Sequence, residues 1–419
     1  MEVLSVGEKI KRARVYKGLT LKDVCGSEIS VSKLSCIENG KVTPEDWVLE
    51  YIASKLDLSM DYLYKNVEDQ INSNLNEILN NPKKDDYEES LKYNLDMAQR
   101  FEYYDLAFYI MHLIFDYLLK INDSKRIQEL LGEYYDLCNN SSDIAKRLTY
   151  YMDVARFFYK IKEYPQAANY FRNVIDSILK SEDKNYTLLG EGIYGEAVCN
   201  VMLGNYKEAY DIAIKLQDLF DYIKDKLKKA KMYHMMAILS LRMDNGDFEY
   251  YESNSYEMYG IKNDFKAEAI FNYASTMFQI GLKEKAVEYI NRALDIYPKE
   301  DKEKLVNFML MCTEELVNNS IAELARELSE TTLDYSIHLD NIKFIEKAYY
   351  LKSKILQKQN NLLSAEMYMN LSLDALAKFG TKKQIYERYM EMGQMYYDIG
   401  SVKEALKYFT LGLNMHKKL

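Results

Sequence analysis

Apolar residues near the start of the chain recur at intervals of three and four, which is the spacing of one face of an α-helix. Val6, Ile10 and Ala13 share such a face, so we expect a first helix over residues 6–16. The same spacing predicts further helices over residues 21–25, 31–38 and 44–56. The apolar residues expected on the inward side of the longest of these are Trp47, Val48, Tyr51, Ile52 and Leu56.

Polar residues at the expected helix starts support these boundaries. Two pairs have the spacing of a capping box: Ser5 with Glu8, and Thr20 with Asp23. Thr43 precedes Pro44 and is expected to cap the helix over 44–56, because proline is favoured at the first helical position. Ser59 is expected to cap a last short helix that ends at Tyr64.

The helix expected over residues 31–38 has two chemically different sides. At about 100° per residue, Leu34 and Ile37 lie on one side, which we expect to face the core. The opposite side carries small or polar residues: Ser32, Ser35, Cys36 and Asn39. A short helix with small outward side chains, preceded by another short helix, can approach the edges of DNA bases.

The first 66 residues resemble the Xre/Cro-type helix-turn-helix family. The resemblance is carried by residues 7–14 (GEKIKRAR), 18–20 (GLT) and 32–41 (SKLSCIENGK). It implies a DNA-binding domain over residues 1–66. The side chains expected to face bases or nearby phosphates are Ser32, Lys33, Ser35 and Cys36. The side chains expected to contact the DNA backbone are Lys22, Asn39 and Lys41, helped by Arg12 and Arg14.

The second expected helix departs from the family pattern. Lys22 stands near the position where the family often has a contacting glutamine, Cys25 replaces a small alanine, and the turn that follows is one residue short. An alternative to DNA binding stays open at this point. In that alternative, Ser32, Lys33 and Ser35 are only a solvated face on a domain that binds protein, and Cys36 is a small filler rather than a contact to a thymine methyl group.

A pattern with a period of about 40 residues fills the later part of the chain. Six alanines each follow a turn and stand near the start of an expected helix: Ala167, Ala209, Ala286, Ala325, Ala365 and Ala405. Their successive spacings are 42, 77, 39, 40 and 40. The spacing of 77 indicates two units with a degenerate copy between them, and Gly246 to Phe248 marks another turn in that interval. The small alanine lets two antiparallel helices approach closely.

These units resemble tetratricopeptide repeats. The resemblance implies about eight helical pairs over residues 89–419, stacked into a right-handed α-superhelix that binds peptide on its concave face and supports dimerisation. The polar segment 67–88 is expected to be a linker, with room for a helix over 69–80. The expected fold is therefore all-α, with an N-terminal helix-turn-helix domain followed by a tetratricopeptide-like superhelix.

Together the two parts resemble the RRNPP family of peptide-pheromone-responsive regulators from Gram-positive bacteria. This resemblance implies a cytoplasmic, homodimeric transcription factor that binds a short imported signalling peptide, which changes its DNA binding. Family targets include sporulation, competence, virulence and toxin genes. A dimer of helix-turn-helix domains implies an inverted-repeat operator. The alternative is a protein-interaction regulator that sequesters or dephosphorylates a response regulator, although such relatives usually carry an N-terminal helical bundle.

Capture of a short peptide requires side chains that pair with its backbone, and an asparagine amide both donates and accepts hydrogen bonds. Asn200 and Asn272 are expected on first helices of the pairs, facing the groove. Weaker candidates are Arg156, Arg242 and Asn307, since an inward arginine would hold a C-terminal carboxylate. The alternative is that the asparagines are solvated or cap a neighbouring turn.

The overall charge of −10 is compatible with DNA binding because it is unevenly distributed. Residues 1–41 hold eight lysine and arginine residues against five acidic ones, so a local basic face can contact phosphates. The 419 residues include only four prolines and sixteen glycines, which favours helices. Five cysteines without a C-x-x-C pair fit a reducing cytoplasm. No long apolar run or signal-peptide core is present, so no membrane partner is expected.

Two features that could indicate enzyme chemistry are weak. Residues 190–195 (GEGIYG) match G-x-G-x-x-G, but a dinucleotide site needs a preceding strand, and Glu191 would repel phosphate. These glycines are expected to allow close helix contact instead. The histidines are far apart: His112, His234, His338 and His416. We therefore expect no metal site, no cofactor and no catalytic residue, and the chain is not expected to be an enzyme.

Overall fold

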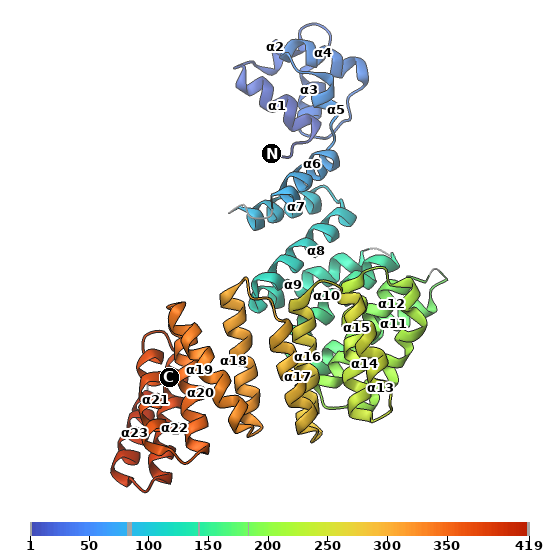
Figure 1. Cartoon of the computed structure of the whole chain (residues 1–419). Helices are drawn as coiled ribbons and strands as arrows, with labels where there is room; N and C mark the ends of the chain where they lie inside the picture. Colours follow the sequence, from blue (N-terminus) through green and yellow to red (C-terminus); the bar gives the residue numbers. More distant parts are fainter. Residues whose placement is uncertain (1, 82–85, 141–142, 183, 417–419) are drawn as a thin grey trace. The chain divides into compact units, whose positions relative to one another are not determined.

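The protein is described by a computed structural model, and the described residues are 2–81, 86–140, 143–182 and 184–416. Their regular secondary structure consists of α-helices α1–α23 and one 3₁₀-helix, η1 (Figure 1). No β-strand occurs among these residues, so the prediction of an all-α fold is confirmed. The chain divides into two compact units, Met1–Ile212 and Ala213–Leu419.

Five short helices begin the first unit: α1 (Val6–Tyr16), α2 (Leu21–Cys25), α3 (Val31–Glu38), α4 (Asp46–Leu56) and α5 (Met60–Tyr64). The predicted bounds of α1, α2 and α3 and the predicted short helix ending at Tyr64 are confirmed. Ser5 and Thr20 close the two predicted capping boxes. Ile10, Leu34 and Ile52 are fully buried at the centre of the core that these helices share.

The start of α4 differs from the prediction. The helix begins at Asp46, and its N-cap is Glu45 rather than Thr43. Trp47 is 50% exposed, so the prediction that it faces inward is wrong. The buried side of α4 runs from Val48 to Leu56 and spans about 140° of the helix, whereas Trp47 lies about 100° outside that stripe.

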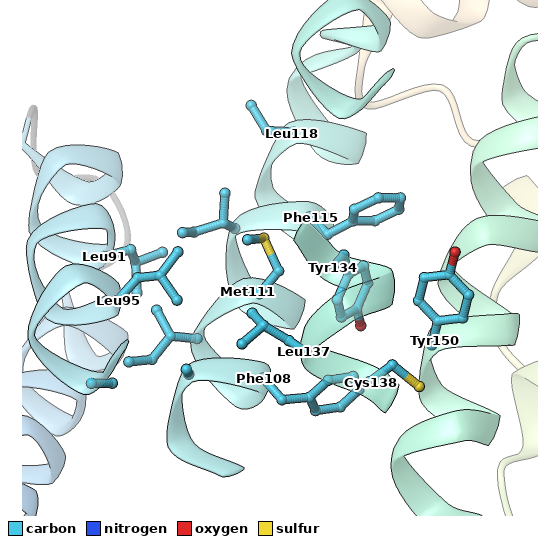
Figure 2. Packing of buried hydrophobic residues seen from close by; sticks show 14 of the residues in the cluster. Leu91, Leu95, Phe108, Met111, Phe115, Leu118, Tyr134, Leu137, Cys138 and Tyr150 are labelled. Carbon is cyan, nitrogen blue, oxygen red and sulfur yellow. The ribbon is translucent and has the colours of Figure 1, made fainter. Parts of the chain in front are cut away.

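The segment expected to be a linker contains helix α6 (Val67–Asn80), which packs against α7 (Tyr87–Arg100). Ile71 of α6 is buried in the same apolar cluster as Leu91 and Leu95 of α7. Figure 2 shows Leu91 and Leu95 directed towards the next helix, which carries Met111. The amphipathic spacing of α6 explains this packing, because its apolar residues share one side.

The first unit continues with longer helices: α8 (Tyr104–Ile121), α9 (Ser124–Asn139), α10 (Ile144–Lys160), α11 (Tyr164–Lys180), α12 (Tyr186–Met202) and the start of α13 (Tyr206–Ala213). Tyr134 of α9 is fully buried between Phe108 and Phe115 of α8 and Tyr150 of α10 (Figure 2). These rings lie 5.1–5.3 Å from the Tyr134 ring, within the range of favourable aromatic contacts.

The second unit contains the remaining helices: η1 (Ile214–Tyr222), α14 (Lys226–Met243), α15 (Phe248–Tyr259), α16 (Asn263–Gln279), α17 (Lys283–Ile296), α18 (Lys302–Asn318), α19 (Ala322–His338), α20 (Ile342–Lys358), α21 (Leu362–Leu376), α22 (Lys382–Asp398) and α23 (Val402–His416). Consecutive helices pack as pairs, for example α16 with α17 and α22 with α23 (Figure 1). The predicted array of helical pairs is confirmed.

The repeated alanines occupy one structural position. Each is the fourth residue of the second helix of a pair, and each is at most 2% exposed: Ala167, Ala209, Ala286, Ala325, Ala365 and Ala405. The degenerate copy predicted between Ala209 and Ala286 is the second helix α15, in which the fourth residue is Tyr251. Tyr251 is also buried, so this pair accommodates a ring where the others hold a methyl group.

The turns within the pairs share a backbone conformation. The residue two positions before the second helix has a positive φ, as in Gly204 (79°), Gly281 (89°) and Gly400 (84°). Glycine has no Cβ and adopts this conformation without steric cost. The glycines in the sequence pattern therefore mark the reversal of chain direction between paired helices.

Candidate functional site

The outer side of α3 carries the residues that the sequence analysis assigned to DNA. Ser32 and Asn39 are exposed, Ser35 and Cys36 are half-buried, and Leu34 on the opposite side is fully buried. Asn39 is the C-cap of α3, and its Nδ2 donates to the Ser35 backbone oxygen over 2.8 Å. The predicted division of α3 into an apolar inner side and a polar outer side is therefore present.

Lys33 lies on α3, with Lys22 and Lys41 outside it in the chain, and the three lysines differ in exposure and in partners. Lys22 and Lys41 are exposed. Lys33 is half-buried, with its Nζ 3.5 Å from Glu45 Oε1 and 5.3 Å from the centre of the Trp47 ring. A hydrogen bond from the Trp47 indole and the nearby charge of Lys33 lower the pKa of Glu45. Glu45 and Trp47 thus belong to the surface beside α3, which sequence reasoning missed because it placed Trp47 in the core.

Arg14 has a role different from the predicted contact with DNA. Its Nε and Nη2 donate to the two carboxylate oxygens of Glu38 over 2.6 and 2.8 Å, and its Nη1 donates to the Leu19 backbone oxygen. The hydrogen bond with Glu38 raises the pKa of Arg14. Both side chains are largely buried, so this bidentate pair joins α1 to the end of α3 and orients the outer side of α3.

The backbone of α1 also lies close to α3. A Cβ at Gly7 would stand 2.2 Å from the backbone oxygen of Ile37, which no side chain tolerates. Arg12, the other predicted helper, is exposed and pairs with Glu2. Gly7 and Arg14 of the segment GEKIKRAR therefore both hold α1 against α3.

The start of the chain is fastened to α6 and α7. Gln70 of α6 exchanges two hydrogen bonds with the backbone of Leu4, over 3.1 and 2.9 Å. Arg100 of α7 donates to Glu8, the acid of the first capping box, over 2.8 Å. Lys9 is 1% exposed, and its Nζ donates to the backbone oxygens of Tyr62 and Lys65. Displacement of α6 or α7 would therefore strain α1 directly.

The residues predicted to bind peptide do not form a single cluster. Asn200 is buried in α12, and its Nδ2 donates to the Glu196 backbone oxygen of the same helix, so it neither faces a groove as predicted nor is solvated as the alternative had it. Arg156 is exposed on α10 and lies 3.7 Å from Asp153 and 3.6 Å from Glu191. Both residues belong to the unit Met1–Ile212.

The other three candidates lie in the second unit. Asn272 is exposed on α16, with its Nδ2 3.4 Å from His234 Nε2 on α14. Arg242 of α14 hydrogen-bonds Gln279 of α16. Asn307 is exposed on α18, where its Nδ2 lies 4.0 Å from Met311 Sδ. The first helices α14 and α16 therefore present polar side chains next to one another, and His234 and Gln279 are members of this surface that the sequence did not indicate.

A buried polar cluster in the first unit was also missed. Asp153 is 1% exposed, and its Oδ2 lies 2.6 Å from His112 Nδ1 and accepts a hydrogen bond from Tyr134 over 2.8 Å. The hydrogen bond with Asp153 raises the pKa of His112 against the opposing effect of burial. In contrast, burial lowers the pKa of His234 to about 4. The wide spacing of these residues in the chain gave no signal of the cluster.

The G-x-G-x-x-G segment lies within the helix α12. A Cβ at Gly195 would stand 2.5 Å from the Phe171 ring of α11, and one at Gly192 would stand 3.1 Å from Ile175. The glycines therefore allow α11 and α12 to approach closely, as the sequence analysis expected. Among the described residues, no group of three or more His, Cys, Asp or Glu side chains is placed to hold a metal ion. None of the helices in the described ranges has the length and apolar character needed to cross a membrane.

Comparison with known proteins gives matches only among solved structures. No protein-family model matches the chain, and no curated protein matches it. The apo quorum sensor NprR from B. thuringiensis is 15% identical, with a TM-score of 0.46, over 84% of this chain and 100% of that chain. Aspartyl phosphate phosphatase F from Bacillus subtilis is 14% identical, with a TM-score of 0.43, over 99% and 96%. PlcR from Bacillus thuringiensis, solved with the peptide PapR7 and DNA, is 15% identical, with a TM-score of 0.28, over 99% and 97%.

Proposed function

We propose that this chain is a cytoplasmic, non-enzymatic transcriptional regulator of the RRNPP family, which binds DNA through α3 and a short signalling peptide through its helical pairs. The observation that carries the proposal is the outer side of α3, which is small and polar and is held in place by the buried Arg14–Glu38 pair. A rigidly held helix of this kind suits the major groove, where bulky side chains would prevent approach to the bases.

The charges around α3 support modest contact with phosphates. Lys22 and Lys41 are exposed and available, whereas Glu45 partly neutralises Lys33. The outward residues of α3 that could make a bidentate contact to a base are Lys33 and Asn39, but Lys33 is paired with Glu45 and Asn39 is hydrogen-bonded to the Ser35 backbone oxygen. We therefore infer that one domain binds weakly and that two domains of a homodimer act together on an inverted repeat.

Peptide binding is proposed for the polar surface on the first helices of the second unit. Asn272, Asn307 and His234 are presented there, and the exposed amides can pair with both the N–H and C=O groups of an extended chain. His234 is neutral near pH 7 because burial lowers its pKa to about 4, so it would offer a hydrogen bond rather than a charge.

Salt dependence of DNA affinity tests the proposal. We expect the affinity of the full chain for a duplex library to fall steeply with salt, because each phosphate contact releases counterions. The double variant Lys22→Ala/Lys41→Ala should lower the slope of log K against log salt by about 0.9 for each phosphate that is no longer neutralised. The matched control Lys299→Ala/Lys403→Ala removes two exposed lysines of the second unit and should leave the slope unchanged. A wild-type slope near zero would end the DNA proposal.

The peptide part is tested separately with synthetic peptides from short reading frames beside the gene. A cognate peptide should change DNA affinity by at least about fivefold, the lower end of ordinary allosteric coupling. Asn272→Ala and Asn307→Ala should weaken the peptide effect while leaving peptide-free DNA binding intact. If no peptide changes DNA affinity and the chain instead binds a response regulator, the protein-interaction alternative replaces this part.

A further inference from the structure

The region around the degenerate helical pair α14–α15 differs from the rest of the array in two ways. The second helix of the preceding pair begins as the α-helix α13 and continues without a break as the 3₁₀-helix η1. A 3₁₀-helix is thinner and rises about 2.0 Å per residue instead of about 1.5 Å, so its side chains are displaced from their α-helical positions. Tyr251 then occupies the alanine position of α15, and its hydroxyl is hydrogen-bonded to Gln217 of η1.

A cavity of about 450 Å³ lies at this place, which is within the usual range of ligand pockets. Its aromatic lining consists of Phe220, Tyr233, Tyr250 and Tyr251. Phe220 and Tyr233 are stacked with ring centres 4.0 Å apart, and Tyr250 is 59% exposed at the rim. The remaining lining residues are Gln217, Asp221 and Asp247, so the only charges in the lining are negative.

Asp221 and Asp247 are available to a ligand. Both are exposed, and neither side chain forms a hydrogen bond or an ion pair with another residue in the described ranges. Asp247 is the N-cap residue of α15 but makes no capping hydrogen bond through its side chain. Nearby, Lys229 Nζ lies 5.8 Å from the centre of the Phe220 ring. The lining itself therefore carries two carboxylates and no cationic side chain, and the Phe220 ring lies within the distance range of cation–π contacts to an ammonium group.

We propose that this cavity binds an organic cation, meaning an alkylammonium or guanidinium group carried on an apolar body. Carboxylates pair with such a cation, and the faces of the tyrosine rings attract it through their quadrupoles. The apolar body would lie against Phe220 and Tyr233. The site is lined by η1, by the start of α15 and by Tyr233 of α14, and it shares no residue with the surface of Asn272, Asn307 and His234 that is proposed for the signalling peptide. It does not depend on DNA binding.

The test uses n-butylguanidinium and its neutral analogue n-butylurea with the full chain at constant ionic strength. Saturation-transfer NMR should show saturable binding of the cation, with binding of the urea at least about tenfold weaker, since a charge-assisted hydrogen bond is absent from the neutral analogue. The double variant Asp221→Asn/Asp247→Asn should weaken cation binding by a similar factor. It preserves shape at two exposed positions, and thermal unfolding will confirm that it folds. Asp334→Asn, an exposed change on α19, is the matched control and should bind as wild type does.

A second pair of probes distinguishes the source of the cation. Acetyl-Ala-Arg-Ala-amide is compared with the same peptide containing neutral citrulline. If the arginine peptide displaces n-butylguanidinium and the citrulline peptide does not, the cation site is supported and its ligand is a basic side chain of a protein or peptide. If neither peptide displaces n-butylguanidinium while n-butylguanidinium itself still binds, the cation site is supported and its ligand is a small molecule. Equal binding of n-butylguanidinium and n-butylurea, or unchanged binding in the double aspartate variant, would overturn the proposal.

Discussion

At the scale of single residues, Lys33 shows how neighbours decide what a charge can do. Its position in α3 suits contact with DNA, but Glu45 and the Trp47 ring both hold its ammonium group. A phosphate would have to compete with Glu45 for this group and would also be repelled by it. Exposed ion pairs contribute little stability, so the exchange is feasible, but its net gain is smaller than that of an unpaired lysine.

His112 leads to a prediction about pH. Its pKa is raised in the folded chain, mainly by the hydrogen bond with Asp153. The folded state therefore binds the proton more tightly than the unfolded state, whose histidine pKa is about 6.5. The resulting stabilisation is fully present below that value and is lost as pH rises through the folded pKa. His112→Gln should thus be most destabilising at acid pH and progressively less so towards pH 9, as measured by thermal unfolding.

Another histidine provides the control for this pH dependence. His234 has a lowered pKa of about 4, so its contribution has the opposite sign and is lost as pH falls from about 6.5 towards 4. A His112→Gln effect that is the same at pH 6 and pH 9 would contradict a raised His112 pKa in the folded chain.

At the scale of helices, two glycines predict opposite effects of the same substitution. The Phe171 ring lies 2.5 Å from where a Cβ on Gly195 of α12 would stand, so Gly195→Ala must displace this ring or separate α11 from α12. We expect a loss of about 1–3 kcal/mol from overpacking. Gly132 lies in α9 with open space at that position, so Gly132→Ala should stabilise the chain by up to about 1 kcal/mol. Urea unfolding measures both, and equal effects would contradict the packing role of Gly195.

The helices were largely predictable because their signals are local. Caps such as Ser5 and Thr20 and the repeated alanines depend on residues a few positions apart, and the structure confirms them. The long-range features were not predictable. The bond between His112 and Asp153 joins residues 41 positions apart, and the outward position of Trp47 depends on which stripe of α4 meets the core. Burial of Asn200 likewise follows from packing rather than from its helix position.

At the scale of the whole molecule, the last two helical pairs leave apolar residues uncovered. Val402, Leu406 and Leu413 lie within about 40° of one another on α23, and each is more than half exposed. A second stripe on α21 contains Leu363, Met367 and Leu371. Such stripes mark surfaces that bind another protein. Under the proposed function, we expect the partner to be a second copy of the chain. A two-fold symmetric dimer would bury the same stripes on both copies, and it would provide the two DNA-binding domains that an inverted repeat requires.

If the proposed homodimer forms through these stripes, Leu406→Glu with Leu413→Glu should convert it to a monomer. Burial of two charges in an apolar interface is strongly unfavourable, whereas both positions tolerate glutamate in a free subunit because they are exposed. Sedimentation equilibrium should show the mass falling from that of two chains to that of one. The affinity for the operator DNA should also fall, because a monomer carries a single DNA-binding domain and so makes half of the contacts with DNA. Lys403→Glu with Lys407→Glu changes charge on the same helix outside the stripe and should leave the mass unchanged. A wild-type chain that is already monomeric, or a leucine variant that stays dimeric, would show that these stripes do not join two copies.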